Sequence, residues 1–357
     1  MKKVFLFALL LLGATSAYSA VVLDSVITTA GRNDKSKAVY SYDADGRNNL
    51  TISYTWSANQ WTNLSKTENT FDANGNITEI ITSMWDNNVW ANMYRQLYTY
   101  DANNAKTSMT YQGWNGSAWE NSSRYTYQNR EDGKCKAAVY YNWDNGKWFE
   151  ADSNFYSYNA AGDVLVMQTF RYHHVESGYD EDGWFKNTYV GYVYNEKGQQ
   201  IQRLTQTWYE SSKMFVNTNK YDYEYDEKGD RSHHSYSYWY NNDWQQQHSK
   251  DYIYNDAHLL TQSILQNCSS GTCDNSQKEE YTYDAEGNIL TESISDWTGS
   301  AWGQSTYTQF FYHNDGSEAI DQITNDPLPM TNKVIRNGQI LILRDGKTYN
   351  ALGTEIK

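Results

Sequence analysis

The stretch Tyr40-Ser41-Tyr42-Asp43-Ala44-Asp45-Gly46 carries the pattern that decides the fold. Its last aromatic residue, which precedes Asp and then Gly, recurs along the chain, and we take it as the anchor of each copy. The anchors are Tyr42, Phe71, Tyr100, Tyr127, Tyr158, Tyr194, Tyr225, Tyr254, Tyr283 and Tyr312. Five of the nine spacings are 29 residues, and the others are 27, 31, 36 and 31. Self-similarity at this period predicts a repeat protein in which each unit stacks on its neighbours.

Pairs of tryptophan residues, five positions apart, lie midway between the anchors. The pairs are Trp56 with Trp61, Trp85 with Trp90, Trp114 with Trp119, Trp143 with Trp148, Trp239 with Trp244 and Trp297 with Trp302. Tyr172 with Trp184 and Trp208 with Phe215 fill the same slots across longer loops, so all 14 Trp lie in these slots. Turn-forming residues between the partners predict β-hairpins. The two rings should then face each other across the strands, where such pairs contribute about 0.2–1 kcal/mol.

Cys268 and Cys273 occupy the slots of the remaining hairpin. Opposed residues in a hairpin lie about 4.5–5.5 Å apart at Cα, which overlaps disulfide geometry. We therefore predict a disulfide here, with metal binding or redox chemistry as the less favoured alternative. Cys135 is left over, and we expect a buried free thiol, with intermolecular pairing as the alternative.

The segment after each anchor predicts a second kind of turn. In Asp43…Gly46 and Asp284…Gly287, Asp accepts backbone hydrogen bonds and Gly takes a positive φ. Before the anchor, Tyr residues alternate at period two, which places a row of Tyr on one face of the sheet. No convincing amphipathic helix is present. We predict an all-β fold of about nine 29-residue β-hairpin repeats. They should form a coiled antiparallel meander or spiral sheet, because open sheets rarely exceed about ten strands without curling.

The composition fits a thin aromatic core. The 357-residue chain has a formal net charge of −14, few aliphatic residues, 14 Trp and 33 Tyr. Few aliphatic residues with a high charge would indicate disorder, but here aromatic residues take over as the packing units. The acidic charge argues against nucleic acid and anionic membranes as partners. It favours a basic partner, with simple solubility as the alternative.

Residues 1–20 resemble a secretory signal peptide. Lys2 and Lys3 precede an apolar run over residues 4–12, and small residues follow up to Ala20. The run is too short to span a bilayer of about 30 Å. Loss of the two lysines would change the net charge from −14 to −16. We expect an exported protein without membrane insertion.

Two stretches carry a family resemblance, Tyr283-Asp284-Ala285-Glu286-Gly287-Asn288-Ile289 and Phe71-Asp72-Ala73-Asn74-Gly75-Asn76-Ile77. They resemble the YD repeats of Rhs-type secreted proteins, and the resemblance, over about residues 38–316, implies a spiral of β-hairpins. This period is longer than the usual YD period, and the Trp hairpin is additional. Nothing matches the peptidase-like core or toxin domain of Rhs proteins, so their function is not implied. We assign residues 21–322 to the repeat domain and 323–332 to a linker.

Residues 333–357 form the tail of the chain. An alternating apolar stretch after Gly338 is followed by Asp345-Gly346-Lys347, Tyr349 and Gly353. This pattern is similar to the end of the C-terminal sorting domain of type IX secretion cargo in Bacteroidota. The resemblance implies export by the type IX secretion machinery to the cell surface or the medium. The alternative is a terminal β-hairpin that caps the array.

No motif for catalysis, a cofactor or a metal is apparent, so we predict a protein that is not an enzyme and has none of these sites. The exception to the repeat is the longer loop between Tyr172 and Trp184. Loops on a rigid scaffold often carry function, with a tolerated insertion as the alternative. The candidate binding residues are Tyr172, His173, His174, Glu176, Tyr179, Asp180, Asp182 and Trp184.

These observations predict an exported, non-enzymatic binding protein that captures another protein. The net charge favours a cationic ligand. The resemblance to type IX cargo of Bacteroidota, which often live in the gut or mouth, implies that this ligand is host-derived, and the digestive protease trypsin is an example. Two alternatives stay open. One is a glycan-binding module that uses Trp and Tyr as stacking platforms. The other is a structural adhesin or surface component, which would need neither a captured protein nor a glycan.

Overall fold

The computed structural model describes residues 21–31, 34–174, 182–314, 332–336, 339–344, 347–350 and 355–356. The expected signal peptide and the expected linker up to residue 331 lie outside these residues. No helix among the described residues has the length and hydropathy needed to cross a bilayer.

Twenty antiparallel strands form one sheet in which each strand pairs with the next along the chain. The strands are β1 (Val21–Ala30), β2 (Asp34–Tyr42), β3 (Asn48–Ser57), β4 (Gln60–Phe71), β5 (Ile77–Asp86), β6 (Val89–Tyr100), β7 (Lys106–Trp114), β8 (Trp119–Asn129), β9 (Cys135–Asp144), β10 (Lys147–Tyr158), β11 (Val164–His173), β12 (Gly183–Tyr194), β13 (Gln200–Tyr209), β14 (Met214–Tyr225), β15 (Arg231–Tyr240), β16 (Asp243–Tyr254), β17 (Leu260–Ser269), β18 (Thr272–Tyr283), β19 (Ile289–Trp297) and β20 (Trp302–Asn314).

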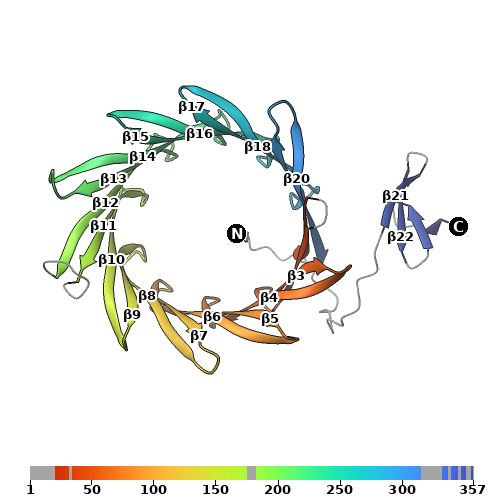
Figure 1. Ribbon diagram of the computed structural model, residues 1–357, viewed down its shortest axis with the longest axis horizontal. Coiled ribbons are helices and arrows are strands. Elements are labelled where there is room, and N and C mark those ends of the chain that lie inside the picture. The colour runs from red at the N-terminus through yellow and green to blue at the C-terminus, as the bar shows by residue number, and fades with distance from the viewer. Residues whose placement is uncertain are drawn as a thin grey trace. The chain divides into compact units, whose positions relative to one another are not determined.

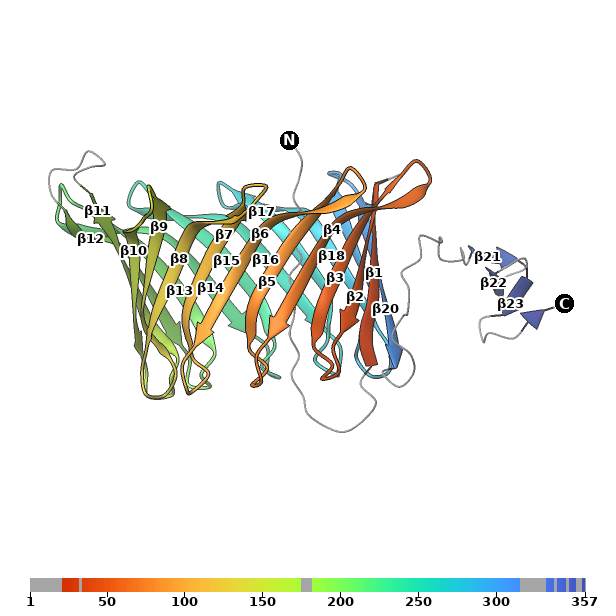
Figure 2. The ribbon, with the colours of Figure 1, turned by 90° about the horizontal axis from the view of Figure 1, so that it is seen from below.

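The sheet closes on itself, because β1 also pairs with β20 (Figures 1 and 2). At this junction the Oγ1 atoms of Thr28 and Thr308 lie 3.1 Å apart, and the N–H of Gly31, just after β1, donates to the Ser305 carbonyl at 3.0 Å. The predicted all-β coiled meander is therefore present, but it closes into a barrel instead of ending as an open spiral. Closure removes the unpaired edges that an open sheet would expose.

The tail contains a separate sheet, also antiparallel. Its strands are β21 (Asn332–Arg336), β22 (Gln339–Arg344), β23 (Lys347–Asn350) and β24 (Glu355–Ile356), paired in chain order. It thus has more strands than one terminal hairpin.

The two Trp of each pair lie directly opposite each other in the strand register. The opposed residues are Trp56 and Trp61, Trp85 and Trp90, Trp114 and Trp119, Trp143 and Trp148, Trp239 and Trp244, and Trp297 and Trp302. In all six pairs the ring centroids are 4.8–5.1 Å apart and the planes are inclined by 61–71°. This edge-to-face geometry is the one that aromatic quadrupoles favour.

The predicted disulfide joins Cys268 and Cys273, which are opposed in the same way. Their Cα atoms are 4.0 Å apart. A spacing this short is typical of a non-hydrogen-bonded pair, where side chains approach most closely. The disulfide therefore takes the place of an aromatic pair.

In five of these hairpins the turn is shorter than the four intervening residues suggest, whereas the strand pairing ends at the Trp residues themselves for Trp114 with Trp119 and for Trp297 with Trp302. Ser57 and Gln60 are themselves a strand pair, so only Ala58 and Asn59 form the turn, both with positive φ. This is the two-residue type I′ turn, whose twist matches that of the flanking strands. Asn87-Asn88, Asn145-Gly146, Asn241-Asn242 and Ser270-Gly271 have the same conformation.

Each of these hairpins also contains a β-bulge that the sequence pattern does not reveal. In all nine hairpins, the residue three positions after the second member of the opposed pair has no partner on the first strand, so the register shifts there by one residue. These residues are Leu64, Met93, Ser122, Ala151, Asn187, Thr218, Gln247, Ser276 and Ser305. Bulges increase the local twist of a strand, and their repetition at one position favours uniform curvature of the sheet.

The choice of Tyr127 as an anchor is wrong. The register shift that marks the other anchors from Tyr42 to Tyr283, such as Tyr100 opposite Lys106, falls here at Asn129 opposite Cys135. With Asn129 as the anchor, the spacings on both sides become 29 residues. The pattern search failed because Asn replaces the aromatic ring. Cys135 is a free, partly buried thiol at the start of β9, and burial raises its pKa.

The largest side chains that are almost fully buried are those of Ser83, Ser153 and Ser263. Most aromatic rings of the barrel are only half-buried. The packing layer is therefore thin, with rings lying over small residues and backbone. This explains how a chain with few aliphatic residues folds.

Whether an aromatic pair can replace the disulfide at positions 268 and 273 can be tested by mutation. Replacing both Cys268 and Cys273 by Ala should lower the free energy of unfolding by about 2 kcal/mol, the loop entropy of a short closed ring. Replacing both by Trp should recover part of this loss through an edge-to-face pair. Urea unfolding of the two double variants provides the comparison. A Trp pair that is no better than the Ala pair would show that it cannot replace the disulfide.

Candidate binding rim formed by the turns

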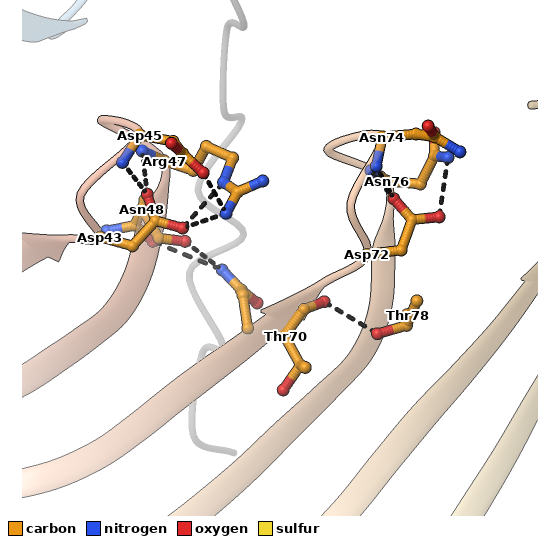
Figure 3. A network of polar contacts seen from close by, with 10 residues as sticks. Asp43, Asp45, Arg47, Asn48, Thr70, Asp72, Asn74, Asn76 and Thr78 are labelled. Carbon is orange, nitrogen blue, oxygen red and sulfur yellow. Dashed lines mark hydrogen bonds and ion pairs between the residues drawn. The ribbon is translucent and has the colours of Figure 1, made fainter.

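Nine turns of the same construction connect the end of each even-numbered strand from β2 to β18 with the next strand. In the turn after Phe71, the Asp72 Oδ1 atom accepts from the N–H groups of Asn74 and Asn76 at 2.9 and 2.8 Å. The Gly75 N–H donates to the Asp72 carbonyl at 3.1 Å, and Gly75 has φ of 84°. Figure 3 shows this turn beside the equivalent turn from Asp43 to Arg47. The side chain thus caps the turn, as the sequence predicts for Asp.

The fourth position of each turn has a positive φ. It is Gly in seven turns and Asn104 or His258 in the other two. Asn or His can thus substitute for Gly where the backbone is left-handed. The predicted capping Asp is present in five turns, Asn159, Asn195 and Asn255 cap three others, and Arg130 begins the remaining turn.

These turns concentrate the acidic charge of the chain. The nine five-residue segments contain fourteen Asp and Glu but only five Lys and Arg, against a net charge of −14 for the whole sequence. The segments are 43–47, 72–76, 101–105, 130–134, 159–163, 195–199, 226–230, 255–259 and 284–288. We call them the turn rim.

The capping hydrogen bonds keep several rim carboxylates ionised. Side-chain hydrogen bonds from Arg47, Asn76 and Asn288 hold the pKa of Asp43, Asp72 and Asp284, respectively, below the ordinary value. A hydrogen bond from Lys228 lowers the pKa of Asp256 in the same way. The negative charge of the rim therefore persists in mildly acidic solution.

Adjacent turns are tied to one another. The fifth residue of a turn reaches the fourth residue of the next: Lys134 Nζ lies 2.7 Å from the Gly162 carbonyl, and Gln199 Nε2 lies 3.0 Å from the Gly229 carbonyl. The anchor hydroxyl reaches back to the previous hairpin, as Tyr100 does to the Ile77 carbonyl at 2.8 Å. Tyr158, Tyr194, Tyr225 and Tyr283 donate in the same way. These links hold the rim as a continuous structure.

Two open pockets lie between adjacent turns, at equivalent positions of the repeat. One, of about 460 Å³, lies between the turns that begin at Asn255 and Asp284, and Tyr281 and Tyr283 line it. The other, of about 440 Å³, lies between the turns that begin at Asn195 and Asp226, and Tyr223 and Tyr225 line it. Each combines Tyr rings with acidic side chains.

The insertion predicted to bind a ligand is described only in part. Tyr172 stands opposite Trp184 with ring centroids 5.0 Å apart, and His173 stacks on Phe185 at 4.3 Å. His174 Nε2 lies 2.6 Å from the Glu150 carbonyl.

Glu176, Tyr179 and Asp180 lie outside the described residues, whereas Asp182 lies just before β12 and takes part in an interaction. The structure therefore brings Tyr172 and Trp184 together. It packs His173 and His174 against other side chains of the hairpin.

Several slot Trp rings have a cation over one face, which weakens the case for the glycan alternative. A Lys or Arg of one hairpin lies over a slot Trp of the next, as Arg124 does over Trp148 at 4.6 Å and Lys186 over Trp208 at 4.4 Å. The same contact is made by Lys66 over Trp90, Arg95 over Trp119, Lys220 over Trp244 and Lys278 over Trp302. With an edge-on partner as well, these rings offer few free faces for stacking on a sugar.

A polar cluster on the Tyr-bearing face was missed by the sequence analysis. Glu279 Oε2 accepts from Ser263 Oγ at 2.7 Å, Lys250 Nζ at 2.8 Å and Tyr281 OH at 2.9 Å. Burial opposes ionisation of Glu279, but these hydrogen bonds outweigh it and lower its pKa. Glu292, opposite Tyr281, has a raised pKa because of burial and the Glu279 charge.

The signal for this cluster was available in the sequence but weak. Glu279 lies four residues before its anchor, and Lys250 holds the same position in the preceding repeat, whereas repeats such as those with Gln96 and Asn154 carry an uncharged residue there. The opposite charges become informative only with the structure, in which Lys250 Nζ lies 2.8 Å from Glu279 Oε2. Among the described residues, no group of three or more His, Cys, Asp or Glu could hold a metal ion.

The contribution of the Lys134–Gly162 hydrogen bond between adjacent turns to the free energy of unfolding can be measured at Gly162. A Cβ added there would displace Lys134 Nζ, whereas a Cβ at Gly287 would meet only Leu259 Cδ1 at 3.6 Å, and the two glycines have φ near 91° and 90°. Both Ala variants should be strained, but Gly162→Ala should lose about 1 kcal/mol more because its hydrogen bond to Lys134 is lost. Urea unfolding of both variants gives the comparison. Equal unfolding free energies would show that the tie contributes nothing.

His234 predicts a pH dependence of stability. Burial, followed by the charges of His248, Arg231 and Lys250, lowers its pKa to about 4, and its Nδ1 lies 2.8 Å from the Tyr252 hydroxyl. The unfolded chain binds the proton more readily between about pH 6.5 and 4, so stability falls as the pH is lowered through this window. We expect a loss of about 1 kcal/mol from this half-buried group. Urea unfolding should show a shallower pH dependence for His234→Asn, and parallel curves would contradict the assignment.

Comparisons with known proteins give similarities of fold only. No protein-family model matches the chain, and no curated protein matches it. A DUF3836 family protein from Parabacteroides distasonis is 21% identical over 26% of this chain and 84% of its own, with a TM-score of 0.22. The TcdB2-TccC3-TEV structure is 15% identical over 89% of this chain and 18% of its own (TM-score 0.37). A porin-like protein from Bacteroides uniformis is 9% identical over 82% and 98% (TM-score 0.30). At these scores the similarities carry no argument about function.

Proposed function

We propose that this protein is an exported, non-enzymatic binding protein that captures a basic protein through the turn rim. The observation that carries the proposal is the concentration of acidic residues in nine turns linked along one rim of the barrel. A continuous surface of one charge attracts an oppositely charged partner and speeds its association. A chain that needed charge for solubility alone could distribute it over all its loops.

Two further observations support a scaffold that presents the rim. Hydrogen bonds tie successive turns, as in the contacts of Lys134 and Gln199 with the next turn. A surface that is already ordered loses little conformational entropy when it binds. The carboxylates that cap the turns have lowered pKa values, so the surface keeps its charge.

The charge argument sets the class of ligand. A basic digestive protease such as trypsin is the example we propose. Export rests on the signal-like residues 1–20 and the tail similar to a type IX sorting domain, which together would place the protein on the cell surface or in the medium. The glycan alternative is less favoured because Trp148, Trp208 and several other slot rings have a cation over one face and an edge-on ring beside them. A purely structural role remains the second candidate.

Binding of inactivated trypsin to the purified full chain tests the proposal. The dissociation constant should rise by about tenfold or more between about 0.05 and 0.5 M salt, because the Debye length shortens to a few ångström. An acidic protein of similar size should not bind, which provides the control. A lack of trypsin binding, or an affinity independent of salt, would contradict capture by the charged rim.

A further inference from the structure

Successive turns leave a notch between them, and in two places the chain itself fills this notch with a cation. The Arg47 guanidinium lies 4.7 Å from the ring centroid of Phe71, the next anchor, and pairs with Asp43 and Asp45 at 2.7 and 2.8 Å. Lys134 Nζ lies 5.6 Å from the ring centroid of the next anchor, Tyr158, as it reaches the next turn. A ring, carboxylates and carbonyl groups together make a site suited to a cation.

The two open pockets lie at notches where the fifth turn residue is not cationic. Gln199 and Leu259 occupy the position that Arg47 and Lys134 hold elsewhere. Leu259 Cδ1 lies 3.6 Å from a Cβ built at Gly287, so its side chain follows the same path toward the next turn. These notches therefore keep the Tyr rings of the site but lack an internal cation.

The pockets also hold carboxylates that have no ion-pair partner among the described residues. Glu286 lines the pocket beside Leu259, and Glu196 and Glu224 line the pocket beside Gln199, where Lys197 also contributes to the wall. By contrast, both Asp43 and Asp45 are ion-paired with Arg47. Negative charge thus remains uncompensated where the notch is open.

We propose that these two notches bind lysine or arginine side chains of the basic partner. The inference rests on the proposed function and names its chemistry: beside the Leu259 or Gln199 side chain, an inserted cation contacts the Tyr rings and carboxylates that line the pocket, as Arg47 contacts Phe71 and Asp43. Recognition is then by defined sites on the rim and does not come from net charge alone.

The test compares two double variants with the same added charge. Leu259→Lys with Gln199→Lys places an internal lysine in each open notch, as Lys134 does in its own. Ala44→Lys with Ala73→Lys adds the same charge to the rim at second turn positions that line neither pocket. The probe is a labelled hexalysine peptide, and fluorescence anisotropy gives its dissociation constant with the full chain at about 0.15 M salt. Thermal unfolding confirms that each variant is folded.

The double variant Leu259→Lys with Gln199→Lys, which fills both notches, should bind hexalysine about tenfold more weakly than the wild-type chain. The control variant should bind it less than about threefold more weakly. Equal losses, or no loss on filling the notches, would overturn the inference in favour of diffuse attraction. If the wild-type chain binds inactivated trypsin but not hexalysine, the inference that the notches bind cations is wrong and the proposed function stands. If filling the notches weakens hexalysine binding but the chain does not bind trypsin, the choice of trypsin as the ligand is wrong and the inference about the notches stands.

Discussion

The register between neighbouring strands is the constraint on which the rest of this structure depends. A sheet with a thin packing layer cannot rely on a large apolar core, so each strand is held mainly by its two neighbours. An opposed pair, either two edge-to-face rings or the disulfide, and the bulge three residues later fix that register in each hairpin, and a type I′ turn adds to this in five of them. Because the same offset recurs from hairpin to hairpin, the sheet curves evenly and its first and last strands can meet.

The sequence contained most of the local structure. The five-residue Trp spacing predicted opposed rings, and Cys268 and Cys273 in the same slots predicted the disulfide that the structure contains. The anchor at Asn129 was missed because a side-chain search looks for rings, whereas the backbone register does not depend on one. Closure was missed because no local pattern encodes the contact between Thr28 and Thr308, which are 280 residues apart in the chain.

The candidate site shows the same division. The Asp and Gly that recur in the turns were legible in the sequence, but their gathering into one rim follows only from strands that alternate in direction around the barrel. The notches depend on the side chain of one turn reaching the next, as Lys134 reaches Gly162, over a separation of 28 residues. The acidic net charge, which composition left without a location, now lies largely on this rim.

Direct evidence for closure would test the account most sharply, since an open spiral would separate the first and last strands. Thr28 and Thr308 can both be replaced by Cys, and their hydroxyl oxygens lie 3.1 Å apart in the present structure. After mild oxidation, peptide mapping by mass spectrometry should find a disulfide between positions 28 and 308 of one chain, beside the native Cys268–Cys273 disulfide. Free thiols at both introduced positions, or crosslinks only between separate chains, would contradict the closed barrel.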